Sequence, residues 1–515
     1  MNGAESLLRS LIASGVDVCF ANPGTSEMHF VAALDNVKGM RPILGLFEGV
    51  VTGAADGYAR MAGKPASTLL HLGPGLANGL ANLHNARKAS SPIVNIVGDH
   101  ASTHQRYDAP LSSDLVGFAR PVSAWIHTST SARTVGADAA RAVQASLEWP
   151  GRIATLVLPA DTAWDMADTV APALPKPSPA TAPEASIDLV AKRMRSGKKT
   201  VILIRGKALE EQGLRAAGKI AEQTGARIMC DTFFPRLQRG VGRVKLERLP
   251  YFAENVVDTL TGTELMVLVG AQPPVSFFAY PDKPSWLTPN DCQIAVLSHQ
   301  HEDGIAALES LAYALGAENA IERLAERRPI QIDLNGKLDA SAIMRIVARH
   351  LPEQAIVADE SLSSGFAHYD VTAHAAPHDF LNMTGGSIGS MMAVSTGAGI
   401  ACPDRKVVTL QGDGSAMYIL QSLWTQAREN VDVTTVIYAN RGYKILTNEL
   451  KRVGASTDGM AAASMFDLTN PTLDWVALAN GMGVEAIRVE SARAFDAAFA
   501  SAMKQRGPRV IEAVI

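Results

Sequence analysis

Apolar residues along this chain follow two recurring patterns. Short continuous apolar runs that end in turns containing Gly, Asn or Asp predict buried strands, and longer segments with apolar residues every three or four positions predict helices. The first helix is expected over residues 4–14 and the first strand over residues 17–20, and the same alternation returns throughout the chain. Alternating strands and helices are typical of parallel sheets covered by helices. The sequence therefore predicts an α/β fold.

The chain is long enough for several such units. Its 515 residues correspond to roughly three domains of ~150 residues each. A Pro-rich stretch over residues 172–183 cannot continue a helix or a sheet and is typical of a linker. We therefore expect three domains, at residues 1–171, 184–330 and 334–515, each with a parallel sheet flanked by helices.

Charge and cysteine content exclude several classes of protein. The net charge of −4 and the pI near 6.3 give no electrostatic basis for binding nucleic acid or an anionic membrane. No apolar run reaches the ~18 residues that a membrane-spanning helix needs. The four cysteines lack the CxxC spacing of a zinc site and fit a reducing compartment. We expect a cytoplasmic protein whose partner is a small molecule.

Two polar loops follow neighbouring apolar strands in the last expected domain. The first is GDGS at residues 412–415, and the second is NRG at residues 440–442. In a parallel sheet both loops lie at the edge where α/β proteins bind ligands. Asp413 and Asn440 can offer oxygen ligands to a hard cation such as Mg²⁺, and the glycines let the backbone close on a diphosphate. Taken alone, GDG is equally typical of an ordinary tight turn.

The spacing of these loops resembles the thiamine diphosphate motif of the pyruvate decarboxylase and acetolactate synthase superfamily. The resemblance implies thiamine diphosphate and Mg²⁺ as cofactors, with Asp413, Asn440 and Gly442 at the metal. The cofactor-binding residues that it implies are Ser361, Ser363, Gly386, Ile388, Gly412, Gly414, Ser415, Tyr443 and Ile445.

A glutamate at the start of a helix supports the same family. Residues 48–60, EGVVTGAADGYAR, look like the family's glutamate-bearing helix, and their small side chains predict a tightly packed helix. In the family this glutamate hydrogen-bonds N1′ of the aminopyrimidine and so helps to make the thiazolium C2 a carbanion. Glu48 is the matching residue. The alternative is that Glu48 only interacts with the dipole of its helix.

A glycine-rich loop provides a third point of resemblance. Residues 384–389, TGGSIG, are similar to the family's loop beneath the cofactor. There a large aliphatic residue separates the two cofactor rings, and a backbone carbonyl accepts a hydrogen bond from the 4′-amino group. Ile388 and Gly386 match those positions, although an isolated isoleucine is more often an ordinary core residue.

Within the superfamily the chain resembles benzoylformate decarboxylase most. Its Asn-Pro-Gly-Thr turn at residues 22–25 places Thr25 where the family uses a hydroxyl against the substrate carboxylate, and His71 matches a strand-end acid–base histidine. The imidazole pKa near neutrality suits that role, although a lone histidine is often structural. The chain lacks the second active-site histidine of that decarboxylase, because residues 273–282 read PPVSFFAYPD.

These observations predict non-oxidative decarboxylation of a 2-oxo acid, of the benzoylformate, aromatic or branched type, through a carbanion at C2. The alternatives are an acetolactate synthase-like carboligase or carbon–carbon lyase and, less favoured, a homologue that has lost catalysis. The middle segment has no Gly-rich dinucleotide fingerprint, so neither FAD nor another nucleotide is expected there. The family places its cofactor between subunits, which implies a homodimer or homotetramer with active sites at subunit interfaces.

Overall fold

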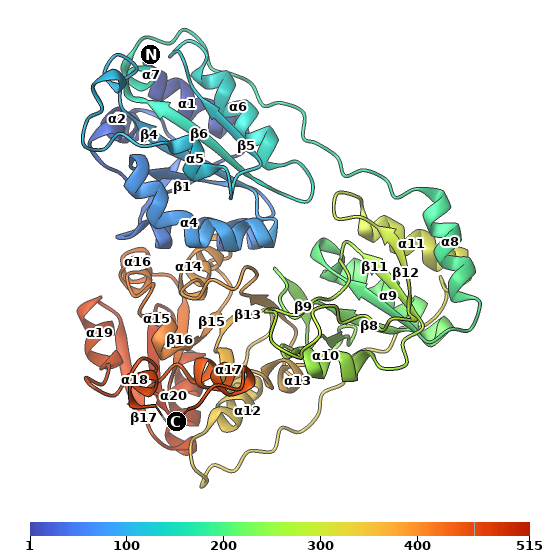
Figure 1. Cartoon of the computed structure of the whole chain (residues 1–515). Helices are drawn as coiled ribbons and strands as arrows, with labels where there is room; N and C mark the ends of the chain where they lie inside the picture. Colours follow the sequence, from blue (N-terminus) through green and yellow to red (C-terminus); the bar gives the residue numbers. More distant parts are fainter. Residues whose placement is uncertain (458) are drawn as a thin grey trace.

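The computed structural model of the chain describes residues 1–457 and 459–515. It contains three sheets, of six, five and seven strands, and helices cover their faces (Figure 1). Nearly all strand pairs are parallel, with one antiparallel pair in the third sheet. The predicted α/β fold with parallel sheets flanked by helices is therefore confirmed.

The first sheet follows the order β2-β1-β3-β4-β6-β5. Its strands are β1 (Val18–Asn22), β2 (Arg41–Leu44), β3 (Ala66–Leu70), β4 (Ile93–Asp99), β5 (Trp125–Thr128) and β6 (Ile153–Pro159). The helices around it are α1 (Gly3–Ala13), α2 (Met28–Asn36), α3 (Glu48–Ala62), α4 (Leu72–Ala89), α5 (Leu115–Ala119), α6 (Val135–Ser146) and α7 (Ala160–Trp164).

The second sheet follows the order β10-β8-β7-β11-β12. Its strands are β7 (Thr200–Ile204), β8 (Arg227–Cys230), β10 (Glu247–Arg248), β11 (Leu265–Val269) and β12 (Gln293–Ser298), and its helices are α8 (Glu184–Met194), α9 (Glu211–Thr224), α10 (Ala253–Leu260) and α11 (Gly304–Ala314). Residues 172–183, before α8, contain no helix and only an isolated bridge at Ala180. They cross from the first sheet to the second as an extended strap (Figure 1).

The third sheet follows the order β17-β18-β16-β15-β13-β14-β9. Its strands are β9 (Leu237–Arg239), β13 (Ile356–Glu360), β14 (His378–Asn382), β15 (Val407–Gly412), β16 (Val433–Ala439), β17 (Glu485–Val489) and β18 (Arg509–Val514). The helices are α12 (Ala340–His350), α13 (His368–Thr372), α14 (Met391–Ala401), α15 (Asp413–Ala416), α16 (Ser422–Glu429), α17 (Lys444–Arg452), α18 (Met460–Ser464), α19 (Trp475–Gly481) and α20 (Ala492–Ala502).

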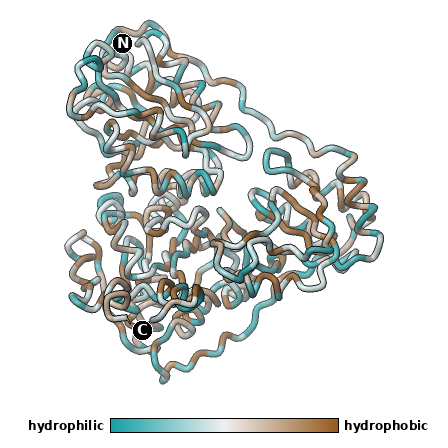
Figure 2. The backbone as a smooth tube through the Cα atoms, viewed as in Figure 1, coloured by the Kyte–Doolittle hydropathy of each residue, from teal (hydrophilic) through white to brown (hydrophobic). Residues whose placement is uncertain are grey.

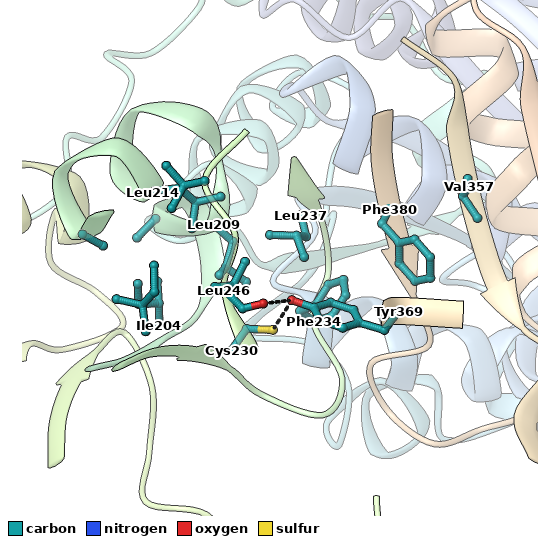
Figure 3. Close-up of a cluster of buried hydrophobic side chains, with 14 of the residues drawn as sticks. Ile204, Leu209, Leu214, Cys230, Phe234, Leu237, Leu246, Val357, Tyr369 and Phe380 are labelled. Atoms are coloured by element: carbon teal, nitrogen blue, oxygen red, sulfur yellow. Dashed lines mark hydrogen bonds between the residues drawn. The ribbon is translucent and has the colours of Figure 1, made fainter. Parts of the chain in front are cut away.

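The edge strand β9 comes from the middle of the chain. It pairs antiparallel with β14, so a short piece of the expected middle domain completes the third sheet. The two segments also share one apolar core, in which Ile204 and Leu214 lie in the same cluster as Val357 and Phe380 (Figure 3). At this boundary the Tyr369 hydroxyl donates a hydrogen bond to a backbone carbonyl of the middle segment. The expected domain limits stay a prediction.

Buried apolar residues are frequent in the strands of all three sheets, and the backbone coloured by hydropathy shows hydrophobic and hydrophilic stretches in turn along the chain (Figure 2). The helix α3 is an exception to the amphipathic pattern, because 14 of its 15 residues are buried. It packs against α14 so closely that a Cβ atom at Gly57 would lie 1.9 Å from the Val394 carbonyl oxygen, and one at Gly397 would lie 1.8 Å from the Ala54 carbonyl oxygen. The tightly packed helix expected from the small residues is confirmed. No described helix is long and apolar enough to cross a membrane.

Candidate active site

Two loops at the carboxyl edge of the first sheet bring the predicted histidine to a glycine. The strands β1 and β3 are parallel neighbours with Asn22 opposite Leu70, so the turn after Asn22 meets the residue after Leu70. At Gly24 an added Cβ would lie 2.3 Å from the imidazole ring of His71. Only glycine therefore allows this turn to lie against the ring.

A buried carboxylate holds the same histidine from one side. The Nδ1 atom of His71 lies 2.9 Å from Oε2 of Glu27, and Glu27 is only 1% exposed. The same oxygen accepts the Gly24 N–H at 2.7 Å. The hydroxyl of Ser26 donates to Glu27 and lies 3.2 Å from Nδ1. Because the carboxylate accepts from Nδ1–H, the Nε2 atom is left as the nitrogen that can exchange a proton.

Glu27 and Ser26 were not among the residues predicted from the sequence. The available signal was the three-residue spacing from Gly24 to Glu27, which is typical of a side chain that reaches back to the first backbone N–H of a helical turn. Thr25 itself is exposed, and its expected contact with a substrate carboxylate stays a prediction.

Glu48 begins α3 and is 7% exposed. Its Oε2 atom accepts a hydrogen bond from Asn78 Nδ2 at 3.0 Å. One turn further along α4, Asn82 donates to the carbonyl oxygens of Gly49 at 2.8 Å and Gly389 at 3.3 Å. The helix α4 therefore connects Glu48 to the glycine-rich loop of the third sheet. The position of Glu48 at a helix N-terminus also fits the dipole interpretation.

The glycine-rich segment, residues 384–390, is called the cofactor loop below. His84 contacts the Gly385 carbonyl at 3.0 Å. Asn85 donates to the Ser387 carbonyl at 2.8 Å and accepts the Ser387 N–H at 3.2 Å. Gly386 has φ +80°, and its carbonyl has no protein partner among the described residues. It can therefore accept a hydrogen bond from a ligand, and its contact with the 4′-amino group stays a prediction.

The other predicted residue of the loop, Ile388, is half-buried and packs against a core shared by the first and third sheets. The middle segment approaches the same loop: an added Cβ at Gly386 would lie 3.2 Å from the Phe277 ring. Phe277 is 47% exposed and stacks edge-on with Phe233 and Phe278, with ring centroids 5.4 Å and 5.5 Å away. An aromatic surface thus borders the predicted pyrimidine site.

The two predicted metal loops lie side by side, because β15 and β16 are parallel neighbours. Asp413 accepts the Gly414 N–H at 2.8 Å and the Arg441 N–H at 2.6 Å. Asn440 Oδ1 accepts the Gly442 N–H at 3.1 Å. Burial raises the pKa of the Asp413 carboxyl, and the backbone N–H groups oppose that shift.

These loops offer one carboxylate, one amide and backbone carbonyls. The described residues contain no group of three or more His, Cys, Asp or Glu side chains that could hold a metal ion. A cation here would need phosphate oxygens and water to complete its shell, which fits Mg²⁺ better than a fully protein-bound metal.

A cavity of about 270 Å³ adjoins these loops and is lined by Asn440, Gly442, Tyr443 and residues of α17. The Tyr443 ring covers Gly414, where an added Cβ would lie 2.5 Å from it. Ile445 is half-buried on α17. The metal loops, Tyr443 and Ile445 therefore belong to one region.

Two of the three predicted serines hydrogen-bond other side chains of the protein. Ser361 is 2% exposed and donates to Asp359 at 2.5 Å, and Ser415 accepts from the Gln411 amide at 2.6 Å. Ser363 is half-buried. The neighbouring Ser364 accepts a hydrogen bond from Asn440 Nδ2 at 3.4 Å. Contacts of the three predicted serines with a diphosphate stay predictions.

Comparisons with known proteins agree with this geometry. The model described as "Thiamine pyrophosphate enzyme, N-terminal TPP binding domain" matches residues 1–117, and its C-terminal counterpart matches residues 363–513. The chain belongs to the thiamine pyrophosphate-dependent enzyme family. Thiamine pyrophosphate is another name for thiamine diphosphate, so the family's cofactor is the predicted one.

Relatives of this enzyme carry two kinds of name. A Mycobacterium tuberculosis (strain H37Rv) protein named "Putative acetolactate synthase large subunit IlvX" is 50% identical over 100% of this chain and 99% of its own. Benzoylformate decarboxylase of Pseudomonas aeruginosa is 27% identical over 97% of this chain and 96% of its own.

Solved structures show the same fold. The thiamine diphosphate-dependent 4-hydroxybenzoylformate decarboxylase of Rhodococcus jostii RHA1 has a TM-score of 0.83 at 23% identity, covering 99% of this chain and 98% of its own. Benzoylformate decarboxylase from Polynucleobacter necessarius has a TM-score of 0.84 at 21% identity, covering 100% and 99%. At these identities the likeness concerns the fold alone.

Proposed function

We propose that this enzyme decarboxylates a 2-oxo acid with an aromatic or branched side chain, without oxidation, and releases an aldehyde. The observation that carries the proposal is the pair formed by His71 and the buried Glu27. A decarboxylase must return a proton to the carbon that has lost CO₂. An imidazole held in one tautomer at the edge of the sheet is suited to deliver it.

The residues present fit thiamine diphosphate with Mg²⁺. The Gly386 carbonyl would accept the 4′-amino group, and Glu48 would accept a hydrogen bond from the pyrimidine. Asp413, Asn440 and the Gly442 carbonyl would hold the metal. When bound, the cofactor supplies the carbon nucleophile that attacks the 2-oxo group and takes up the electrons left by CO₂.

Proton transfer falls to the chain's own side chains. Glu27 would keep the proton of His71 on Nδ1, so that Nε2 would be free to take a proton from the substrate or to return one to it. Ser26 and the Gly24 N–H donate two further hydrogen bonds to Glu27. The ring therefore keeps its orientation through the reaction cycle.

The aromatic surface beside Gly386 supports the substrate class. Phe277 and Phe278 are 47% and 55% exposed, and Phe277 also contacts Tyr251 with ring centroids 5.4 Å apart. Exposed aromatic rings next to a predicted reaction centre favour an apolar acyl group over a small or charged one.

Carboligation is the second candidate. The 50% identical relative is named as an acetolactate synthase, and the stretch around Phe277 lacks a second histidine. Fewer proton donors would leave more time for attack on a second carbonyl group. This candidate includes a carbon–carbon lyase, in which the same site cleaves the bond that a carboligase forms.

We also propose a homodimer or homotetramer that works in the cytoplasm, with cofactor sites between subunits. The resemblance to the family supports this assembly. Light scattering with and without thiamine diphosphate tests the assembly, and a monomer that turns over substrate would contradict it.

The reaction is tested by giving the protein, with thiamine diphosphate and Mg²⁺, aromatic, branched and short 2-oxo acids and quantifying CO₂ and aldehyde. We expect equal amounts of both from aromatic or branched acids. Phe277→Ala should raise KM for the preferred acid roughly 10-fold, whereas Tyr313→Ala, at an exposed aromatic residue of α11, should not. Ligated products in place of aldehyde would support the second candidate, and no reaction with any acid would refute both.

A further inference from the structure

The carboxylate of Glu360 gathers an unusual set of donors. Glu360 ends β13 and is 2% exposed. Its oxygens accept the backbone N–H groups of Gly389 at 2.5 Å, Ser390 at 2.9 Å and Met391 at 2.8 Å. The Ser390 hydroxyl adds a fourth hydrogen bond at 3.1 Å. These three successive N–H groups lie where the cofactor loop ends and α14 begins.

This arrangement requires an acceptor-only side chain. A carboxylate offers about four lone-pair sites, and all of the surrounding groups are donors. The N-terminus of α14 also favours a negative charge. Burial raises the pKa of Glu360, and the hydrogen bonds from the three N–H groups oppose that shift. A glutamine would turn an NH₂ group toward N–H groups and leave some of them without an acceptor.

The cofactor loop is held from the opposite side by α4. His84 and Asn85 hold Gly385 and Ser387, and Glu360 holds Gly389. Gly386 lies between these fixed points, so the direction of its free carbonyl is set by the contacts on both sides.

Glu360 also reaches the diphosphate side of the predicted site. Gln411 lies opposite Glu360 on the neighbouring strand β15, and its side chain donates to Ser415 at 2.6 Å. Glu360 therefore lies next to both loops that the cofactor would contact.

We propose that Glu360 is a positioning residue that fixes the cofactor loop in its binding conformation before the cofactor arrives. The inference rests on the proposed function, because its consequence is the binding of thiamine diphosphate. The conformation of the loop can be measured separately in the cofactor-free protein. Glu360 touches neither cofactor nor substrate and acts through the loop.

Hydrogen–deuterium exchange of the cofactor-free protein tests this directly. In Glu360→Gln, the peptide covering residues 384–395 should exchange at least ~10-fold faster than in the wild type, while peptides of β16 stay unchanged. Thiamine diphosphate should bind roughly 10- to 100-fold more weakly, the range typical when a group that orients a binding residue is removed. The near-ultraviolet circular dichroism of the bound cofactor should change as well.

The matched control is Glu302→Gln. Glu302 is also buried, at 8% exposure, and also accepts a backbone N–H, from His299 at 2.7 Å, but in the middle segment. Glu302→Gln should leave both the hydrogen–deuterium exchange of residues 384–395 and cofactor binding unchanged. If Glu360→Gln does not fold, Glu360→Asp keeps the charge but withdraws it from the N–H groups, and the same faster exchange is expected.

Unchanged exchange at residues 384–395 in a folded Glu360 variant overturns the inference and leaves the proposed function intact. Equal acceleration by Glu302→Gln also overturns it, because the effect would then be a general loss of stability. Faster exchange confined to the loop supports it, whatever the reaction proves to be. A wild type that binds no thiamine diphosphate refutes the proposed function separately.

Discussion

Replacing Glu27 by glutamine removes the group that orients His71. The carboxylate accepts hydrogen bonds from His71 Nδ1 at 2.9 Å, from the Gly24 N–H at 2.7 Å and from the Ser26 hydroxyl. Glutamine keeps one acceptor oxygen and adds an NH₂ group, so at least one of these donors loses its partner. A hydrogen bond to a charged group contributes ~1.5–3 kcal/mol, which corresponds to a rate roughly 10- to 150-fold lower.

The assay is steady-state kcat and KM for Glu27→Gln, His71→Ala and the double variant, with cofactor affinity and Tm measured for each. His71→Ala should lower kcat by roughly 10²- to 10⁴-fold. Because Glu27 acts through His71, the double variant should be no slower than His71→Ala alone. Multiplication of the two effects, or a Glu27→Gln enzyme with the wild-type kcat, would refute this reasoning.

Three further results are expected. Gly414→Ala should weaken thiamine diphosphate binding, measured by calorimetry, because the new Cβ meets the Tyr443 ring at 2.5 Å; unchanged affinity would contradict the placement of Tyr443. Asp413→Ala should abolish the Mg²⁺ dependence of cofactor binding, and a retained dependence would place the metal elsewhere. Burial lowers the pKa of His368 to about 4 and of His378 to about 3. The unfolded chain takes up these protons below pH ~6.5, so the free energy of unfolding should fall as the pH drops from 6.5 toward 4. The slope is up to ~1.4 kcal/mol per pH unit for each histidine. Urea titrations should show a shallower slope in His378→Gln, and an equal slope would exclude its contribution.

Features that depend on local pattern were predictable. The strand edges that carry His71, Asp413 and Asn440 follow from apolar runs and the turns after them, because parallel strands place their carboxyl ends together. The small residues of α3 likewise indicate a close contact before its partner α14 is known. A resemblance to one family then assigns these edges a common cofactor.

Features that depend on long-range pairing were not predictable. The strand β9 has only three residues, too short for a pattern to assign it to the third sheet. Glu27 and Glu360 are charged residues that become buried only because donors from other segments converge on them. The Ser361 hydroxyl donates to Asp359, two residues before it, and its expected contact with the diphosphate stays a prediction. Side-chain partners of this kind depend on the folded structure and cannot be deduced from the spacing of residues along the sequence.

The most direct test of the proposed decarboxylation is product analysis by NMR. The protein is supplied with thiamine diphosphate and Mg²⁺ and given benzoylformate, phenylpyruvate, a branched 2-oxo acid or pyruvate, each with and without an aldehyde acceptor. We expect free aldehyde from an aromatic or branched acid, and its loss in His71→Ala. A hydroxyketone or acetohydroxy acid without free aldehyde would contradict it.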